Sequence, residues 1–146
     1  MEKSSLSSLK RYNHLVGEID AVYHEASLKL GMSDSVSKIL YTICNVGSSC
    51  LLHDICKQTG LSKQTVHSAI RNLEAKEMVT LELVGGKSKK VCLTEKGEIF
   101  AQKTARRLID MENSILSSWP KEDVQTYLEL TERFLVDLKE CVDKTL

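Results

Sequence analysis

A chain of 146 residues with no net charge, 42% hydrophobic and 27% charged, has the composition of a globular protein with one real core. No apolar run reaches the roughly 18 residues of a membrane helix, and the N-terminus lacks the apolar centre of a signal peptide. Five cysteines without a C-x-x-C pair argue against both a disulfide framework and a zinc knuckle. We therefore expect a cytoplasmic protein with no cofactor, metal or membrane partner.

The N-terminal third predicts two helices. Apolar residues recur every three or four positions from Leu9 to Ala26, which is typical of a long amphipathic helix, and this helix should end near Gly31. Ser33 is a suitable N-cap for a second helix, which should end at Gly47.

The central segment predicts a helix-turn-helix. We expect a short strand over 48–51, a helix over 52–59 that Gly60 closes, and a further helix that Ser62 caps. The inner face of this last helix should be Val66, Ala69, Ile70 and Leu73. A helix-turn-helix places its second helix in the DNA major groove.

Two alternating runs after the helix-turn-helix predict a β-hairpin wing. The runs cover 79–84 and 89–94, and the dipeptide Gly85-Gly86 should form the tip. The residues expected to face inward are Val79, Leu81, Leu83, Val91 and Leu93.

The C-terminal third again predicts helices. Thr94 should cap one long helix that reaches about Ile115, and Pro120 should occupy the first helical position of the last helix. The apolar stripe over Tyr127–Val142 is wider than one partner helix needs. Together with the first helix it exceeds what a small monomer can cover, so we expect a homodimer.

The candidate DNA-binding residues lie on the outer face of the second helix of the helix-turn-helix and on the wing. Seven basic residues stand against three acids over 57–90, an excess that chance scatter could produce but that coincides with the helix-turn-helix. Gln64 can bind adenine, Arg71 can bind guanine or phosphate, and hydroxyls and lysines can bind phosphates. The candidates are Ser62, Lys63, Gln64, Thr65, His67, Ser68, Arg71, Lys87, Lys89 and Lys90.

Several short motifs stand in a fixed order between Asp54 and Gly97. They are Asp54-Ile55-Cys56, Gly60-Leu61-Ser62, Thr65-Val66, Leu73-Glu74 and Leu93-Thr94-Glu95-Lys96-Gly97. In this order and spacing, with the predicted helices around them, the chain resembles the MarR family of bacterial transcriptional regulators.

The resemblance implies a mainly α fold with a winged helix-turn-helix over 33–94 and helical dimerisation segments over 1–32 and 95–146. It implies a homodimeric repressor that binds a pseudo-palindromic site on double-stranded DNA and is released by a small aromatic or apolar effector. Tyr12, Tyr41 and Met111 are the residues that we expect to line the effector pocket.

Four positions depart from the family pattern. Glu77 stands where the recognition helix usually ends in glycine, and Leu81 stands where the next strand usually carries arginine. Gly85 and Lys87 replace the acid and the arginine of an Asp-x-Arg motif in the wing. Lysine lacks the planar donor fork of arginine, so we expect the wing lysines to meet phosphates.

Two alternatives stay open at this stage. A winged helix can serve as a protein-interaction module without DNA, and Cys44, Cys50 or Cys56 could sense oxidants if exposed and acidic enough. The cysteines at apolar-pattern positions also fit as small core residues. Nothing indicates an enzyme, because the sequence has no glycine-rich phosphate loop, nucleophile elbow or paired-acid motif.

Overall fold

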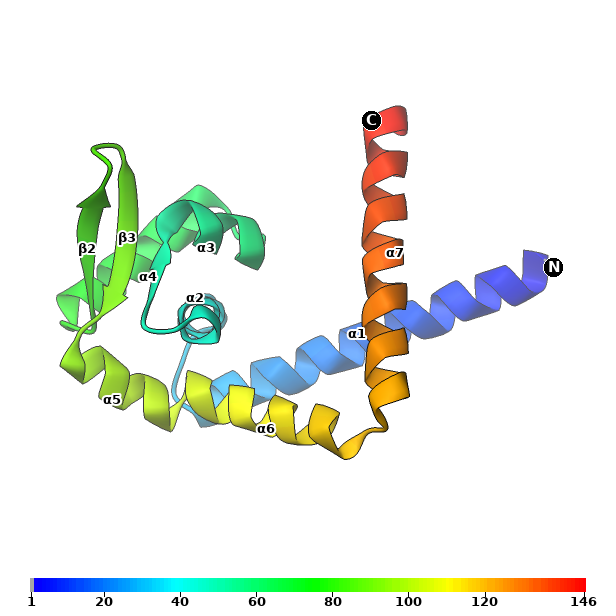
Figure 1. Cartoon of the computed structure of the whole chain (residues 1–146), viewed down its shortest axis with the longest axis horizontal. Coiled ribbons are helices and arrows are strands. Elements are labelled where there is room, and N and C mark those ends of the chain that lie inside the picture. Colours follow the sequence, from blue (N-terminus) through cyan, green and yellow to red (C-terminus); the bar gives the residue numbers. More distant parts are fainter. Residues whose placement is uncertain (1) are drawn as a thin grey trace. The chain divides into compact units, whose positions relative to one another are not determined.

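The computed structural model describes residues 2–146, with side chains from residue 7 onward (Figure 1). Its packing forms two compact units, Met1–Leu108 and Ile109–Leu146. These units reflect packing density alone. The predicted division into a DNA-binding region over 33–94 and dimerisation regions over 1–32 and 95–146 concerns function, and it stays a prediction. No helix in the described part is long and apolar enough to cross a membrane.

The first unit is a bundle of helices with a small antiparallel sheet. Its helices are α1 (Glu2–Lys29), α2 (Asp34–Val46), α3 (Leu52–Thr59), α4 (Lys63–Ala75) and α5 (Glu95–Lys103). Its strands are β1 (Ser49–Leu51), β2 (Val79–Val84) and β3 (Ser88–Leu93), and β3 lies between the other two. The mainly α winged helix-turn-helix is therefore confirmed.

Local capping explains where the helices begin and end. The hydroxyls of Ser33, Ser62 and Thr94 each accept the backbone N–H three residues further on, at 3.2, 3.1 and 3.0 Å. Each bond satisfies an N–H that the first turn leaves without a partner. Gly31 and Gly60 follow the ends of α1 and α3 with φ of 76° and 68°, which glycine adopts without steric cost. The three N-caps and both helix ends were predicted correctly.

The core lies where α2, α3 and α4 meet the base of the sheet. Its fully buried large side chains are Ile39, Leu40, Ile43, Ile55, Val66, Leu73 and Val91. The predicted burial of β2 is wrong toward its end, since Val79 is buried but Leu81 is only half-buried and Leu83 is 70% exposed. The hairpin extends beyond the helices that cover its base (Figure 1).

The single long helix predicted after Thr94 is also wrong. The structure breaks it at Thr104 into α5 and α6 (Ala105–Ser118). Thr104 has φ −128° and ψ −94°, and its hydroxyl donates to the Phe100 carbonyl at 2.8 Å. The Thr104 N–H donates to the Ala101 carbonyl, three residues back, at 3.1 Å, so the regular helical bonding pattern is interrupted here. The hydroxyl bond alone does not cause the break, because Thr42 and Thr131 make the same bond within unbroken helices.

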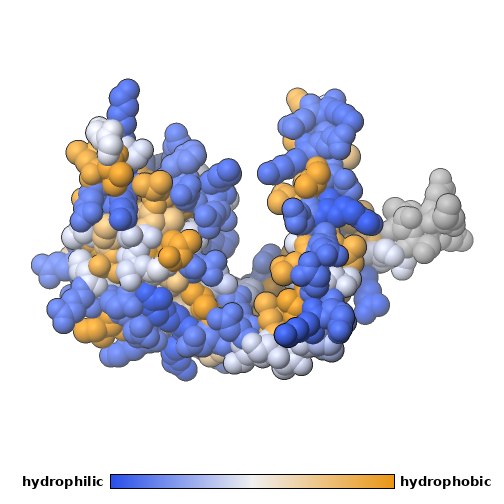
Figure 2. Space-filling view, viewed as in Figure 1, coloured by the Kyte–Doolittle hydropathy of each residue, from blue (hydrophilic) through white to orange (hydrophobic). Residues whose placement is uncertain are grey.

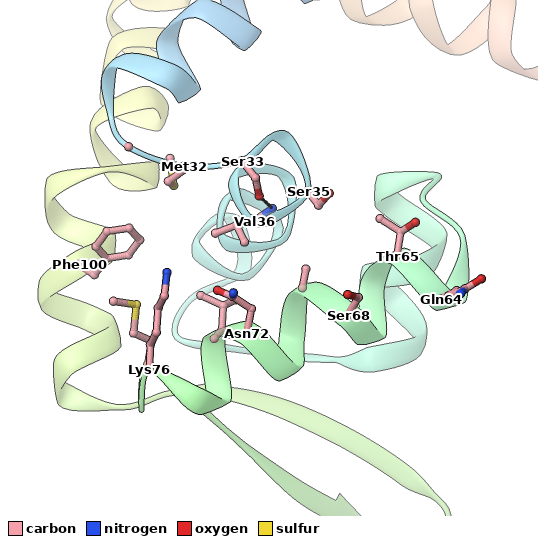
Figure 3. Close-up of a pocket in the computed structure, with 14 residues that line it drawn as sticks. Met32, Ser33, Ser35, Val36, Gln64, Thr65, Ser68, Asn72, Lys76 and Phe100 are labelled. Atoms are coloured by element: carbon pink, nitrogen blue, oxygen red, sulfur yellow. Dashed lines mark hydrogen bonds between the residues drawn. The ribbon is translucent and has the colours of Figure 1, made fainter.

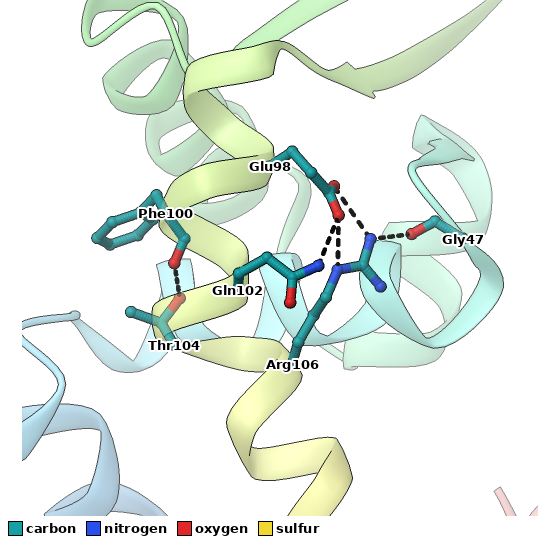
Figure 4. A network of polar contacts seen from close by, with 6 residues as sticks. All are labelled: Gly47, Glu98, Phe100, Gln102, Thr104 and Arg106. Carbon is teal, nitrogen blue, oxygen red and sulfur yellow. Dashed lines mark hydrogen bonds and ion pairs between the residues drawn. The ribbon is translucent and has the colours of Figure 1, made fainter.

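An ion pair joins the two sides of this break (Figure 4). Arg106 donates through Nε and Nη2 to the two Glu98 carboxylate oxygens at 2.9 and 3.0 Å, and Nη2 also donates to the Gly47 carbonyl at 3.0 Å. Gln102 donates to the same carboxylate at 3.2 Å. The hydrogen bonds from Arg106 lower the pKa of Glu98 below its ordinary value. This network connects α5 and α6 to the end of α2.

The second unit consists of the end of α6 and α7 (Lys121–Thr145). Pro120 is the N-cap of α7, with ψ of 143°, and not its first helical residue as predicted; the helix begins at Lys121 because the extended ψ of Pro120 keeps it outside the helix. The rings of Trp119 and Tyr127 meet edge to face with centroids 5.8 Å apart. No residue of α7 is buried.

Candidate nucleic-acid interface

One face of the helix α4 is buried in the core, and the opposite face is exposed to solvent. Val66, Ala69, Ile70 and Leu73 are buried in the core, as predicted. The side chains on the opposite face are exposed, except that Thr65 is half-buried; the exposed ones are Lys63, Gln64, His67, Ser68 and Arg71. The structure therefore places the predicted helical candidates along the side of α4 that faces away from the core, from its N-cap to Arg71.

The first turn of α4 is fixed by its own hydroxyls. Ser62 accepts the Thr65 N–H and donates its own proton to the Thr65 hydroxyl at 2.8 Å. Because the Ser62 hydroxyl is engaged in both roles, Thr65 is the one of the pair whose O–H can donate outward.

The last turn of α4 ends in a left-handed residue. Glu77 has a φ of 61°, the only positive φ among the described non-glycine residues. The Glu77 N–H donates to the Glu74 carbonyl and the Met78 N–H to the Leu73 carbonyl, both at 2.9 Å. These two bonds form a Schellman motif, whose left-handed position glycine usually fills.

A hollow of about 620 Å³ lies along one side of α4 (Figure 3). Its far walls are the start of α2, with Ser33 and Val36, and Phe100 of α5. On α4 it is lined by Gln64, Thr65, Ser68, Ala69, Asn72, Leu73 and Lys76. In Figure 3, Lys76 points into the hollow beside Phe100, and Gln64 lies at its outer end.

The sequence analysis missed Asn72 and Lys76. Both are exposed on α4 and line the hollow. Asn72 follows the predicted residue Ser68 by four positions, and Lys76 follows Asn72 by four, so the three lie on the same side of the helix. The i, i+4 spacing could therefore have identified them.

The wing lysines do not form one cluster. Lys89 pairs with Leu83 across the hairpin, whereas Lys90 pairs with Glu82. Successive residues of a strand point to opposite faces, so Lys89 and Lys90 lie on opposite sides of the sheet. Lys87 is exposed in the loop between the strands, and Lys90 is half-buried.

Most basic side chains among the predicted DNA-binding residues are not engaged in ion pairs with other described residues. Within the described part of the chain, no ion pair involves Lys63, Arg71, Lys87 or Lys89. A cation that is not neutralised within the protein can bind a phosphate without first breaking an internal pair.

The other predicted residues lie elsewhere. Tyr12 is on α1, Tyr41 on α2 and Met111 on α6, and none of them lines the hollow described above. Among the described residues, no three or more His, Cys, Asp or Glu side chains stand close enough to hold a metal ion.

Two of the three candidate sensor cysteines, Cys44 and Cys50, fit the core better than a sensor, whereas Cys56 is half-buried. Cys44 and Cys50 are buried, and burial raises the pKa of both thiols above the ordinary value. A raised pKa keeps these groups in the less reactive thiol form. No described observation favours the redox alternative.

Residues 30–88 match the model of the MarR family. No curated protein matches the sequence. Among solved structures, a MarR family regulator from Neisseria meningitidis is similar with a TM-score of 0.82 at 14% identity, covering 95% of this chain and 99% of that one. S. aureus MepR in complex with DNA has a TM-score of 0.67 at 17% identity, covering 87% and 93%.

A third similar structure concerns BpsR of Bordetella bronchiseptica, whose DNA binding is regulated by 6-hydroxynicotinic acid. Its TM-score is 0.61 at 16% identity, covering 85% of this chain and 98% of that one. The resemblance inferred from the sequence motifs is thus confirmed, and at these identities the solved structures establish the fold.

Proposed function

Since residues 30–88 match the MarR family and most of the chain has the fold of MarR regulators, we propose that this protein is a sequence-specific DNA-binding transcriptional regulator. The observation that carries the proposal is α4, whose buried face fixes it while its exposed face offers Gln64, Ser68 and Arg71 in one row. Amide, hydroxyl and guanidinium groups are the donors and acceptors that read base edges in the major groove.

The regulator is a homodimer in this proposal. In the first unit, α1 exposes Leu9, Tyr12, Leu15, Val16, Ile19, Val22 and Tyr23. In the second unit, α7 exposes Tyr127, Leu128, Leu130, Phe134, Leu135, Leu138 and Val142. Apolar stripes of this length are ordinarily covered by a partner, and a second copy would supply matching stripes. Two α4 helices related by a twofold axis would read a pseudo-palindrome.

The regulator acts as a repressor that a small aromatic or apolar effector releases. The hollow beside α4 has the volume of a small-molecule site, and its Met32, Val36 and Phe100 walls suit an apolar ring. A ligand there would touch Thr65 and Ser68, which belong to the proposed DNA-binding face. The part predicted for Tyr12, Tyr41 and Met111 in effector binding stays a prediction.

A gel-shift titration on mixed genomic DNA at increasing salt tests the proposal. A DNA-binding protein gives complexes whose affinity falls steeply with salt, because each phosphate contact releases counterions. A protein-interaction module of the same fold would give no salt-dependent complex at any concentration. Addition of small aromatic acids and phenols to the complex then tests effector release.

A further inference from the structure

The end of the wing carries large apolar side chains in the open. Leu83 is 70% exposed and Val84 is 43% exposed, directly before the loop that joins β2 to β3. Hydrophobic surface gathers at this end of the hairpin in Figure 2. Neither residue belongs to the core, to which the hairpin contributes Val79 and Val91. Exposed apolar residues at the tip of a projecting hairpin are expected where that tip contacts a partner.

The charged side chains nearest Leu83 on its own face of the hairpin and in the loop are positive. Lys89 is the cross-strand neighbour of Leu83 and stands on the same face, and Lys87 lies in the loop. The acid next to it in the sequence, Glu82, is exposed on the opposite face of the sheet, where Lys90 is its cross-strand neighbour. An apolar side chain with ammonium groups beside it complements a surface of sugars edged by phosphates.

The tip is also thin. Gly85 and Gly86 have φ of 64° and 83°, and an added Cβ would meet no atom within 4 Å at either position. These two residues project no side chains, so Lys87 supplies the one side chain of the three-residue loop. The minor groove of B-DNA is only about 6 Å wide and admits such an element more readily than a hairpin with bulky tip residues.

On the basis of the proposed DNA binding, we propose that Leu83 is a specificity-determining residue that the wing places in the minor groove beside each half-site. Lys87 and Lys89 bind the phosphates that border the groove. The apolar side chain lies against the groove floor, where the 2-amino group of guanine projects and adenine has no such group. Leu83 therefore favours flanks of A·T pairs through shape, without a hydrogen bond to any base.

Three duplexes test this proposal. They share the half-sites recovered by selection from a random pool and differ in the flanking pairs, which are A·T, G·C or inosine·C. Inosine lacks the 2-amino group, so the wild-type protein should bind the A·T and inosine·C duplexes alike and the G·C duplex about tenfold more weakly.

Variants of the wing separate apolar contact from charge. Leu83→Ala should lose most of the flank preference with an unchanged salt slope, whereas Lys89→Ala should keep the preference and flatten the slope by about one unit. Leu28→Ala is the matched control, because Leu28 is 63% exposed but lies on α1, outside the wing, and it should behave as wild type. The large exposure of Leu83 means that the alanine variant should unfold at the wild-type temperature, which a thermal melt checks.

Equal binding of all three duplexes by the wild type would overturn the role of Leu83, and so would a flank preference that survives Leu83→Ala. Either result would leave DNA binding through α4 intact. If the wild-type protein bound no DNA at any salt concentration, the proposed function and this inference would both be wrong.

Discussion

At Gly97 the backbone of α5 packs directly against Met78, in the turn between α4 and β2. A Cβ at this position would collide with the carbonyl group of Met78, which already accepts the Thr94 N–H at 3.0 Å. Gly97→Ala should therefore lower the free energy of unfolding by about 2–3 kcal/mol, as overpacked sites do. Urea unfolding followed by circular dichroism measures this change.

Gly17 supplies the control for this substitution. It lies in α1, and an added Cβ would meet no atom within 4 Å. Gly17→Ala should raise the free energy of unfolding by up to about 1 kcal/mol through helix propensity. Equal effects of the two substitutions would contradict the contact with Met78.

Glu77 holds a backbone conformation that suits glycine. At a φ of 61° a side chain costs roughly 1 kcal/mol, so Glu77→Gly should stabilise the protein by about 0.5–1 kcal/mol. Glu77→Ala removes the same charge but keeps the Cβ, and it should leave the melting temperature nearly unchanged. If both variants gained equally, the charge and not the backbone would be responsible.

Residue-level features of this kind were predictable where the cause is local. Ser33, Ser62 and Thr94 were identified as N-caps because a hydroxyl needs only the backbone three residues ahead. The exposure of Leu83 was not predictable, because an alternating pattern fixes the side of the strand and not how far the covering helices extend.

At the scale of elements, the Glu98–Arg106 pair should stabilise the junction of α5 and α6. Glu98→Gln keeps the shape but loses the charge, and it should lower the free energy of unfolding at neutral pH by about 1–2 kcal/mol. Glu95→Gln is the matched control, because Glu95 also lies in the first turn of α5 but has no ion pair among the described residues.

The pH dependence of this pair has a defined sign. The pKa of Glu98 is lowered in the folded state, so its contribution is fully present above the ordinary value of 4.5 and is lost as the pH falls through the folded pKa. The stability difference between wild type and Glu98→Gln should therefore be constant near neutrality and shrink in acid. A difference that grew as the pH fell would contradict the lowered pKa.

The order of elements was predictable from periodicity, turn glycines and caps, but the break at Thr104 was not. Its helix pattern is continuous, and a mid-helix threonine often causes no break. The Arg106 contact with Gly47 joins segments 59 residues apart, which no local pattern reveals. The hollow beside α4 likewise depends on how α2 and α5 pack against it.

At the scale of the whole molecule, the exposed apolar stripes of α1 and α7 should be buried between two copies. An obligate interface of this kind covers more than about 2,000 Å² in total. Sedimentation equilibrium at micromolar concentration should give twice the 16.4 kDa chain mass. Leu135→Glu, on the α7 stripe, should shift the protein toward monomer, whereas Glu129→Lys, on the opposite, polar side of α7, should not.

If the wild-type protein sedimented as a monomer, the predicted dimer would be wrong, but the proposed contact of α4 with DNA would not be affected. The predicted binding to a pseudo-palindrome would then be wrong as well, since a single α4 reads only one half-site.

The central claim is that the exposed face of α4 reads DNA, and its most direct test is selection from a random duplex pool followed by affinity measurements for wild type and Arg71→Ala. We predict recovery of a pseudo-palindromic site whose affinity falls steeply with salt. Arg71→Ala should weaken binding to it by about 1–3 kcal/mol and relax the preference at one position of each half-site. Failure of the wild type to enrich any sequence, or an Arg71→Ala variant with unchanged affinity and preference, would contradict the account.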